Sequence, residues 1–183
     1  LQVDGTTKKT DAGDGDTTGA VTVDSGNHSV GELAGTGTNL SDYNSSIICK
    51  DSGNNTVAGG NGTSLSDIQV NENDAIVCTI TNTRKVGTLK VVKSFVGTAG
   101  KVNLQIDSVD KATDVGDGGN TGNVTVDTGN HSVGETAGTG TNLSDYTSSI
   151  LCKNGATTVA SGTGTSLTGV PVGENDTVVC TIT

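Results

Sequence analysis

The sequence predicts an all-β fold made of two tandem two-sheet β-sandwich modules. The chain repeats itself: VTVDSGNHSVGE at 21–32 returns as VTVDTGNHSVGE at 124–135, so His28 and His131 lie 103 positions apart. Apolar and polar residues alternate in short runs, which is typical of strands with one buried face. Clusters of Gly, Asn, Asp and Ser separate these runs, and no capped amphipathic helix pattern lies between them. A repeat this close indicates two copies of one module.

The repeat divides the chain into residues 1–84 and 85–183, each of ordinary domain size. The second copy begins with GTLKVVKSFVG at 87–97, a stretch that has no counterpart in the first copy, where Leu1 aligns with Leu104. The first copy ends in CTITNTRK, whereas the second stops at CTIT. We therefore expect the first module to lack its first strand and the second its terminal Asn-Thr segment. Either the chain is a window on a longer tandem array, or a neighbouring subunit fills the missing edge.

Strand-length alternation recurs throughout the second copy, with turn-forming clusters between the runs. About seven short strands per hundred residues favour a two-sheet sandwich in each module. The predicted strands of the second copy are 88–96, 102–107, 122–127, 131–136, 146–153, 166–172 and 176–183.

The alternation also assigns side chains to faces, because successive residues of a strand point to opposite sides. It predicts that each of the following sets shares one face of its strand: Leu89, Val91, Lys93 and Phe95; Ile76, Cys78, Ile80 and Asn82; Tyr43, Ile47 and Cys49; Val133 and Glu135; Val30 and Glu32.

The four cysteines occupy equivalent positions of the repeat. Four cysteines allow three pairings, and the repeat selects the one that gives each module its own bridge, Cys49 with Cys78 and Cys152 with Cys180. Closing a loop of about 30 residues contributes about 3–4 kcal/mol in the chain-entropy view of disulfides. Such a bridge suits a chain with one Phe, two Tyr and no Trp, whose core must be thin. It also indicates an oxidising, extracellular setting.

Composition and motifs exclude several classes of function. The formal net charge of −10 argues against nucleic-acid binding, which needs a basic footprint. No apolar stretch approaches the roughly 20 residues of a membrane span. His28 and His131 share one repeat position, and the adjacent Ser29 and Ser132 would point to the opposite strand face, so no nucleophile-base pair forms there. We expect no enzyme activity and no cofactor.

Three stretches in a fixed order resemble a known family. They are TLKVVKSF at 88–95, HSVGETAGTG at 131–140 and GENDTVVCTIT at 173–183, with the ending CTITNT complete only at 78–83. Together they are similar to the prealbumin-like, or immunoglobulin-like, modules of bacterial and archaeal surface proteins, which include SpaA-type pilin domains and collagen-adhesin B-type stalk domains. The resemblance covers essentially a whole module in each copy. It implies a part of a stalk, a pilus or an adhesin arm.

The resemblance also implies a possible intramolecular amide. Many members of the family join a first-strand lysine to a last-strand asparagine, assisted by a buried glutamate. By position these residues would be Lys93, Glu32 or Glu135, and Asn82. Burial favours the neutral forms that the reaction needs. The first copy, however, has Glu32 and Asn82 without the lysine, and the second has Lys93 and Glu135 without the asparagine. In the alternative interpretation, Lys93, Glu135 and Asn82 are ordinary structural residues.

Two further sets of residues are candidates for modification or ion binding. Asn-x-Ser/Thr sequons mark surface positions that can accept a glycan in a secreted chain. The acidic loops at 11–16 and 114–120 are weak calcium candidates through Asp11, Asp14, Asp114 and Asp117, but neither has a complete calcium-loop pattern, and we favour solvated loops. The nine sequons begin at Asn27, Asn39, Asn44, Asn54, Asn61, Asn123, Asn130, Asn142 and Asn175.

We therefore expect a structural repeat unit of an extracellular filament, pilus or cell-surface stalk, whose partners are copies of itself. Two alternatives stay open. The exposed loops could make the chain an adhesin or ligand-binding arm that holds a glycan or a protein, with avidity from the repetition. The open edge of the first copy could instead make it a subunit that polymerises by donor-strand exchange.

Overall fold

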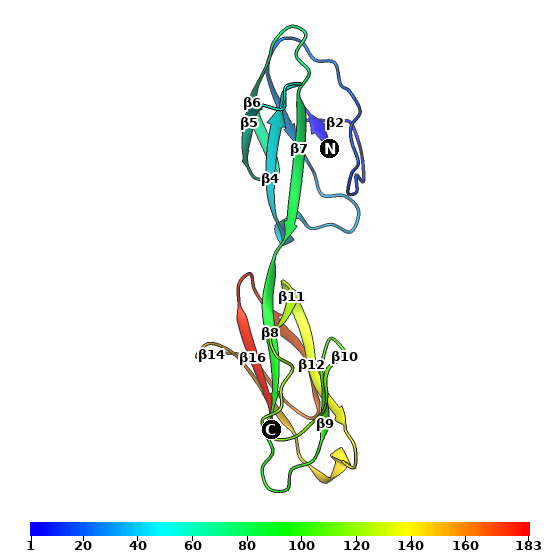
Figure 1. The fold of residues 1–183 in the computed structure, drawn as a ribbon, viewed down its shortest axis with the longest axis vertical. Helices are drawn as coiled ribbons and strands as arrows, with labels where there is room; N and C mark the ends of the chain where they lie inside the picture. Colours follow the sequence, from blue (N-terminus) through cyan, green and yellow to red (C-terminus); the bar gives the residue numbers. More distant parts are fainter. The chain divides into compact units, whose positions relative to one another are not determined.

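A computed structural model describes all residues from Leu1 to Thr183 and contains strands, turns and two short 3-10 helices. The chain divides into two compact units, Leu1–Arg84 (unit 1) and Lys85–Thr183 (unit 2). Each unit consists of two sheets with a core between them (Figure 1). The predicted all-β fold of tandem sandwich modules, each with one disulfide, is confirmed.

Unit 2 has one sheet in the order β10-β9-β12-β15 and a second in the order β11-β8-β16-β13-β14. Its first strand, β8, lies between β11 and β16, and it runs parallel to β16 and antiparallel to β11 (Figure 1). The elements of unit 2 are β8 (Val86–Lys93), β9 (Val102–Ile106), β10 (Val109–Val115), β11 (Val124–Asp127), β12 (Gly129–Ala137), η2 (Leu143–Asp145), β13 (Ser149–Asn154), β14 (Thr157–Thr163), β15 (Ser166–Val172) and β16 (Thr177–Ile182).

Unit 1 has sheets in the orders β2-β1-β3-β6 and β5-β4-β7. The smaller sheet has no counterpart of β8, so β7 pairs only with β4. The elements of unit 1 are β1 (Gln2–Val3), β2 (Thr6–Thr7), β3 (Gly26–Gly31), η1 (Leu40–Asp42), β4 (Tyr43–Lys50), β5 (Thr56–Asn61), β6 (Ser64–Val70) and β7 (Val77–Arg84).

The two cores differ in size although the sequences are near copies. Thirteen apolar residues are fully buried in the core of unit 2, whereas only Ile47, Cys49 and Ile68 are fully buried in unit 1. β8 contributes two of the additional buried residues, Leu89 and Val91, which have no equivalent in unit 1. Their inward direction agrees with the alternation in the sequence.

Several boundaries and two strands differ from the sequence-based prediction. The first strand of unit 2 ends at Lys93 and not at 96, because the backbone N–H of Phe95 turns to the Asp117 carboxylate at 2.7 Å. The strand predicted from Tyr146 begins at Ser149, because Tyr146 closes the 3-10 helix η2. β10 and β14 were missed: both are sheet-edge strands with largely exposed residues, and such strands carry little alternation.

Candidate functional site

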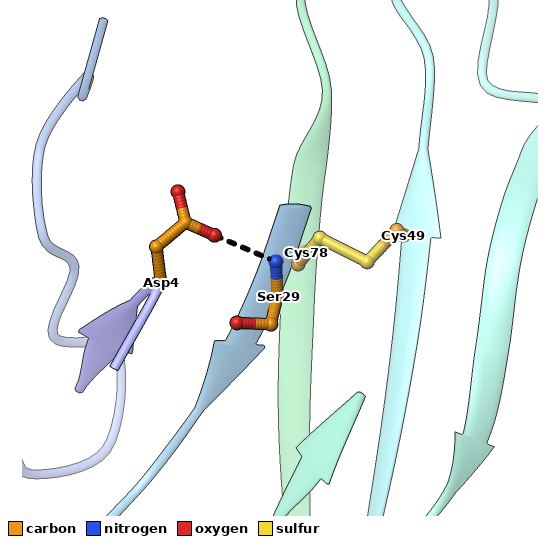
Figure 2. Close-up of a disulfide and its surroundings, with 4 residues drawn as sticks. All are labelled: Asp4, Ser29, Cys49 and Cys78. Carbon is orange, nitrogen blue, oxygen red and sulfur yellow. Dashed lines mark hydrogen bonds between the residues drawn. A yellow bond between two sulfur atoms is a disulfide. The ribbon is translucent and has the colours of Figure 1, made fainter. Parts of the chain in front are cut away.

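The disulfides join directly opposed residues of neighbouring strands. Cys49 of β4 faces Cys78 of β7, and Cys152 of β13 faces Cys180 of β16. Figure 2 shows the first bridge, which joins β4 to β7. Each bridge therefore ties the last strand of its unit to the strand beside it, within the core layer.

A buried ion pair occupies one end of the core of unit 2. Lys93, at the end of β8, is 3% exposed, and Glu135, on β12, is 4% exposed. The Lys93 Nζ lies 2.9 Å from Glu135 Oε2 and donates a hydrogen bond to Oε1 at 3.2 Å, while Oε2 accepts no hydrogen bond of good geometry. The Ser148 hydroxyl also donates to Oε1, at 3.0 Å. The ring of Phe95 stacks against the ammonium, with Nζ 4.4 Å from its centroid, and provides a cation-π contact.

Unit 1 places different partners around the equivalent glutamate. The Asn82 Nδ2 on β7 donates to Glu32 Oε2 at 2.8 Å, and the Ser45 hydroxyl donates to Asn82 Oδ1 at 2.6 Å. The other carboxylate oxygen, Glu32 Oε1, is buried and has no hydrogen-bond partner. A buried acceptor without a partner costs free energy, so this oxygen marks a place where a donor is missing.

The four residues of the predicted amide thus form two separate pairs. Lys93 contacts Glu135 in unit 2, and Asn82 contacts Glu32 in unit 1. Neither unit brings a lysine, a glutamate and an asparagine together. Glu32 and Glu135 are repeat-equivalent, so one glutamate position of the module contacts an asparagine in one copy and a lysine in the other.

Each histidine lies in a polar clasp that the sequence analysis did not find. The His28 Nδ1 lies 2.8 Å from the Asp4 carboxylate and its Nε2 lies 2.7 Å from the Asp24 carbonyl. His131 makes the same contacts with Asp107 and Asp127, both at 2.8 Å. The sequence contains a pattern that could have indicated these contacts: in each copy of the repeat an aspartate stands 24 residues before the histidine.

The clasp favours a charged imidazole. Both ring nitrogens face oxygens that accept hydrogen bonds, and only the doubly protonated ring donates from both. The hydrogen bond to Asp4, followed by that to the Asp24 carbonyl, raises the pKa of His28. Burial alone would lower the pKa of His131, but its hydrogen bonds to Asp107 and Asp127 outweigh burial, so that this pKa is raised too.

The aspartates of the clasps also hold backbone. The Asp4 carboxylate accepts the Ser29 N–H at 2.8 Å (Figure 2), and Asp107 accepts the Ser132 N–H at 2.9 Å. The backbone hydrogen bond from Ser29, and then the bond to His28, lower the pKa of Asp4. Both aspartates have positive φ, 48° for Asp4 and 52° for Asp107. The clasps are therefore structural fastenings of the β1–β3 and β9–β12 pairs.

The acidic loops serve backbone contacts in this fold. Asp11 accepts the Thr36 N–H at 2.7 Å, Asp114 accepts the Thr139 N–H at 2.6 Å, and Asp117 holds the Phe95 N–H. No group of three or more His, Cys, Asp or Glu side chains stands close enough together to hold a metal ion.

All nine sequon asparagines are exposed. Asn39 and Asn142 also cap the two 3-10 helices, since their side chains accept the N–H groups of Ser41 and Ser144. The other seven sequons are Asn27, Asn44, Asn54, Asn61, Asn123, Asn130 and Asn175.

Comparison with known proteins identifies the family. The SpaA family of prealbumin-like fold domains matches residues 2–84 and again residues 96–183, which together make up nearly the whole chain. No curated protein and no solved structure matches. None of the helices has the length and apolar character that crossing a bilayer requires. The match indicates a structural role in a pilus or a surface protein. The chain belongs to the SpaA family of prealbumin-like fold domains and contains two of them in tandem.

Proposed function

We propose that this chain is a load-bearing repeat unit of an extracellular filament, pilus or cell-surface stalk, with copies of itself as its partners. The family match and the tandem arrangement support this role. A covalent cross-link in each unit suits a secreted chain that must persist outside the cell. The observation that carries the proposal is the parallel pairing of β8 with β16 in unit 2.

That pairing suits a module that is pulled from its two ends. β8 is the first strand of unit 2 and β16 is its last, and six consecutive residue pairs join them from Thr177–Thr88 to Ile182–Lys93. Since the strands are parallel and adjacent, a pull at the start of β8 and the end of β16 slides one strand along the other. The ladder is then loaded in shear, and its hydrogen bonds must break together and not one after another.

The disulfide limits what happens after the strands separate. Cys152 and Cys180 enclose 28 residues, which cannot extend while the bridge is intact. At roughly 3.5 Å per extended residue, the bridge withholds about 10 nm of chain. The unit therefore loses its fold under load without releasing its full length.

Single-molecule pulling of the full chain through its two ends tests the proposal. We expect a clear rupture peak for unit 2, and a lower force for unit 1, which has no parallel pair at its β7 edge. A reducing buffer should lengthen the unit 2 step by about 10 nm. The matched control is Gly13→Ala, which lies in unit 1 and whose added Cβ would lie 3.9 Å from its nearest neighbour, so it should leave the unit 2 peak unchanged. Unfolding of unit 2 without a resolvable peak would contradict a mechanical role.

We also propose that a complete module of this kind closes an amide between the lysine and asparagine positions. The pairs Lys93–Glu135 and Asn82–Glu32 support it, because the same glutamate position contacts each reactant in turn. In the reaction the lysine Nζ attacks the asparagine Cγ, the Nζ–Cγ bond forms, and the amide nitrogen leaves as ammonia after taking up protons that the glutamate relays.

This proposal needs a chain in which all three residues meet. A second copy of residues 85–103 fused ahead of Leu1 would place a lysine opposite Glu32 and Asn82. Intact mass should then be lower by one ammonia, and the same fusion with Asn82→Ala should keep its full mass. Full mass in both fusions would leave the lysine, glutamate and asparagine with structural roles only.

We propose that some of the nine exposed sequons carry glycans when the chain is made in a glycosylating host. Their exposure supports this, since an oligosaccharide needs open space around the asparagine. Treatment of the native protein with a broad N-glycanase should increase its gel mobility. An unchanged mobility would count against modification.

A further inference from the structure

Two places in the chain combine an asparagine with a following glycine, Asn61–Gly62 and Asn154–Gly155. In both, the asparagine is the last residue of a strand, β5 or β13, and the glycine opens a short loop to the next strand. Each glycine has a positive φ, 114° for Gly62 and 57° for Gly155, which favours glycine over residues with a Cβ. The hairpin geometry therefore explains the glycine in each pair.

An Asn-Gly pair is open to an intramolecular reaction. Asparagine is among the thermally labile residues of proteins, because the backbone nitrogen of the next residue can attack its side-chain carbonyl carbon. Glycine has no Cβ to block that approach. The two pairs should therefore react at similar rates in an unfolded chain, and the folded structure decides between them.

The hydrogen bonding of the glycine nitrogen differs between the two pairs. The Gly62 N–H donates to the Ser45 carbonyl at 2.8 Å. The Gly155 N–H donates to no group of the chain, and Gly155 is exposed. A backbone nitrogen attacks only after it releases its proton, and an N–H bound to a carbonyl keeps both its proton and its position. Gly62 can therefore react only after a local opening of its loop, whereas Gly155 needs none.

The side chain of Asn154 connects the end of β13 to the turn that precedes β16. Its Nδ2 donates to Asp176 Oδ1 at 2.6 Å, and Asp176 Oδ2 accepts the Gly173 N–H at 2.7 Å. Both contacts are partly buried. An amide suits this place because it can donate to a carboxylate, whereas a second carboxylate can only accept. Loss of the Asn154 amide would therefore leave two carboxylates facing each other.

Unit 1 shows what a carboxylate requires at this position. The repeat equivalent of Asn154 is Asp51, since each follows a Cys-Lys pair. The Asp51 carboxylate accepts the Asn55 N–H at 2.8 Å and the Asn55 side-chain amide at 3.0 Å. The side-chain bond from Asn55, and then the backbone bond, lower the pKa of Asp51. In unit 2 the loop Gly155–Ala156 offers no side-chain amide, so a carboxylate at 154 would lack these donors.

We propose that Asn154 is a site of spontaneous deamidation in the folded chain. The Gly155 nitrogen attacks Asn154 Cγ, the N–Cγ bond forms, and the side-chain amide nitrogen leaves as ammonia with the proton that Gly155 releases. Water then opens the resulting five-membered imide at either carbonyl, which yields aspartate or isoaspartate. The product carries a carboxylate beside Asp176, and isoaspartate also adds a backbone atom between β13 and β14. The inference goes beyond the mechanical role and does not depend on it.

The test follows both asparagines in the full chain, produced in a host that adds no glycans because Asn61 belongs to a sequon. The folded chain is incubated at neutral pH, and peptide mapping by mass spectrometry locates the mass gain that replacement of an amide by a carboxyl group produces. Asn154 should convert at least about fivefold faster than Asn61, the factor that corresponds to the net stability of one hydrogen bond. In urea the two rates should become similar. Equal rates in the folded chain, or an Asn154 that stays intact there, would overturn the proposal.

Two variants separate the reaction from its consequence. Asn154→Gln keeps an amide but cannot close the same five-membered ring, so it should abolish conversion at 154 and leave the rate at Asn61 unchanged. Asn154→Asp supplies the carboxylate directly. Its urea midpoint for unit 2, followed by Tyr146 fluorescence in a Tyr43→Phe chain, should fall at neutral pH and recover when Asp176→Asn is added. An unchanged midpoint would overturn the assignment of Asp176 as the group that opposes the product.

Discussion

Removing the disulfide should affect the two units unequally, although the bridges are equivalent. The perturbations are the paired substitutions Cys49→Ala with Cys78→Ala, and Cys152→Ala with Cys180→Ala. The enclosed loops span 29 and 28 residues. In the chain-entropy view, loops of this length contribute about 3–4 kcal/mol each to the free energy of unfolding. Removing the disulfide therefore lowers the free energy of unfolding by about the same amount in both units.

The apolar core that remains without the disulfide differs between the two units. Unit 2 retains eleven fully buried apolar residues besides its two cysteines, and each buried aliphatic side chain contributes about 1.5–3 kcal/mol before conformational entropy is counted. Unit 1 retains only Ile47 and Ile68. A small domain has a net stability of about 5–15 kcal/mol. We expect unit 2 to stay folded with a stability lower by about 3–4 kcal/mol, and unit 1 to unfold at 25 °C.

Tyrosine fluorescence provides a separate probe for each unit. The chain has two tyrosines and no tryptophan, with Tyr43 in unit 1 and Tyr146 in unit 2. Urea titration in a Tyr43→Phe background reports unit 2 alone, and in a Tyr146→Phe background it reports unit 1 alone. Extrapolation to zero denaturant yields the free energy of unfolding of each. Equal losses in the two units, or a unit 1 that stays folded without its bridge, would refute the reasoning.

Three further predictions concern unit 2. Lys93→Met should lower the free energy of unfolding in urea by about 3–5 kcal/mol, because Glu135 is left buried without its partner. The double change Lys93→Met with Glu135→Leu should leave the stability close to that of the native chain. A small cost for the single change would contradict a desolvated pair. Gly87→Ala should lower the free energy of unfolding by about 1–3 kcal/mol, because an added Cβ would lie 2.5 Å from a backbone carbonyl oxygen. In the control Gly116→Ala the added Cβ would lie 3.9 Å from its nearest neighbour. This control should change the free energy of unfolding by under about 0.5 kcal/mol. The raised pKa of His131 stabilises the folded state fully below its ordinary value of 6.5, and this contribution is lost as pH rises through the raised value. In the Tyr43→Phe background, which reports unit 2, thermal unfolding at pH 5 and pH 8 should show this loss with His131 present and not in His131→Gln.

Local sequence determined a large part of this structure. The repeat alone predicted the pairing of Cys49 with Cys78 and of Cys152 with Cys180, because equivalent copies must close equivalent loops. Strand alternation predicted that Lys93 and Glu135 point inward, and both are buried. These features follow from spacing along the chain, which any copy of the module shares.

Tertiary structure decided which segments become strands at the edges. VTVD forms β11 at Val124–Asp127 and no strand at 21–24, although the residues are identical. A strand exists only when a neighbour accepts its hydrogen bonds, and β8 provides that neighbour in unit 2 alone. The clasp of His131 by Asp107 likewise joins residues 24 positions apart that meet only when β9 pairs with β12. Sequence determines the side-chain pattern of each strand, and the presence of a partner determines whether that strand forms.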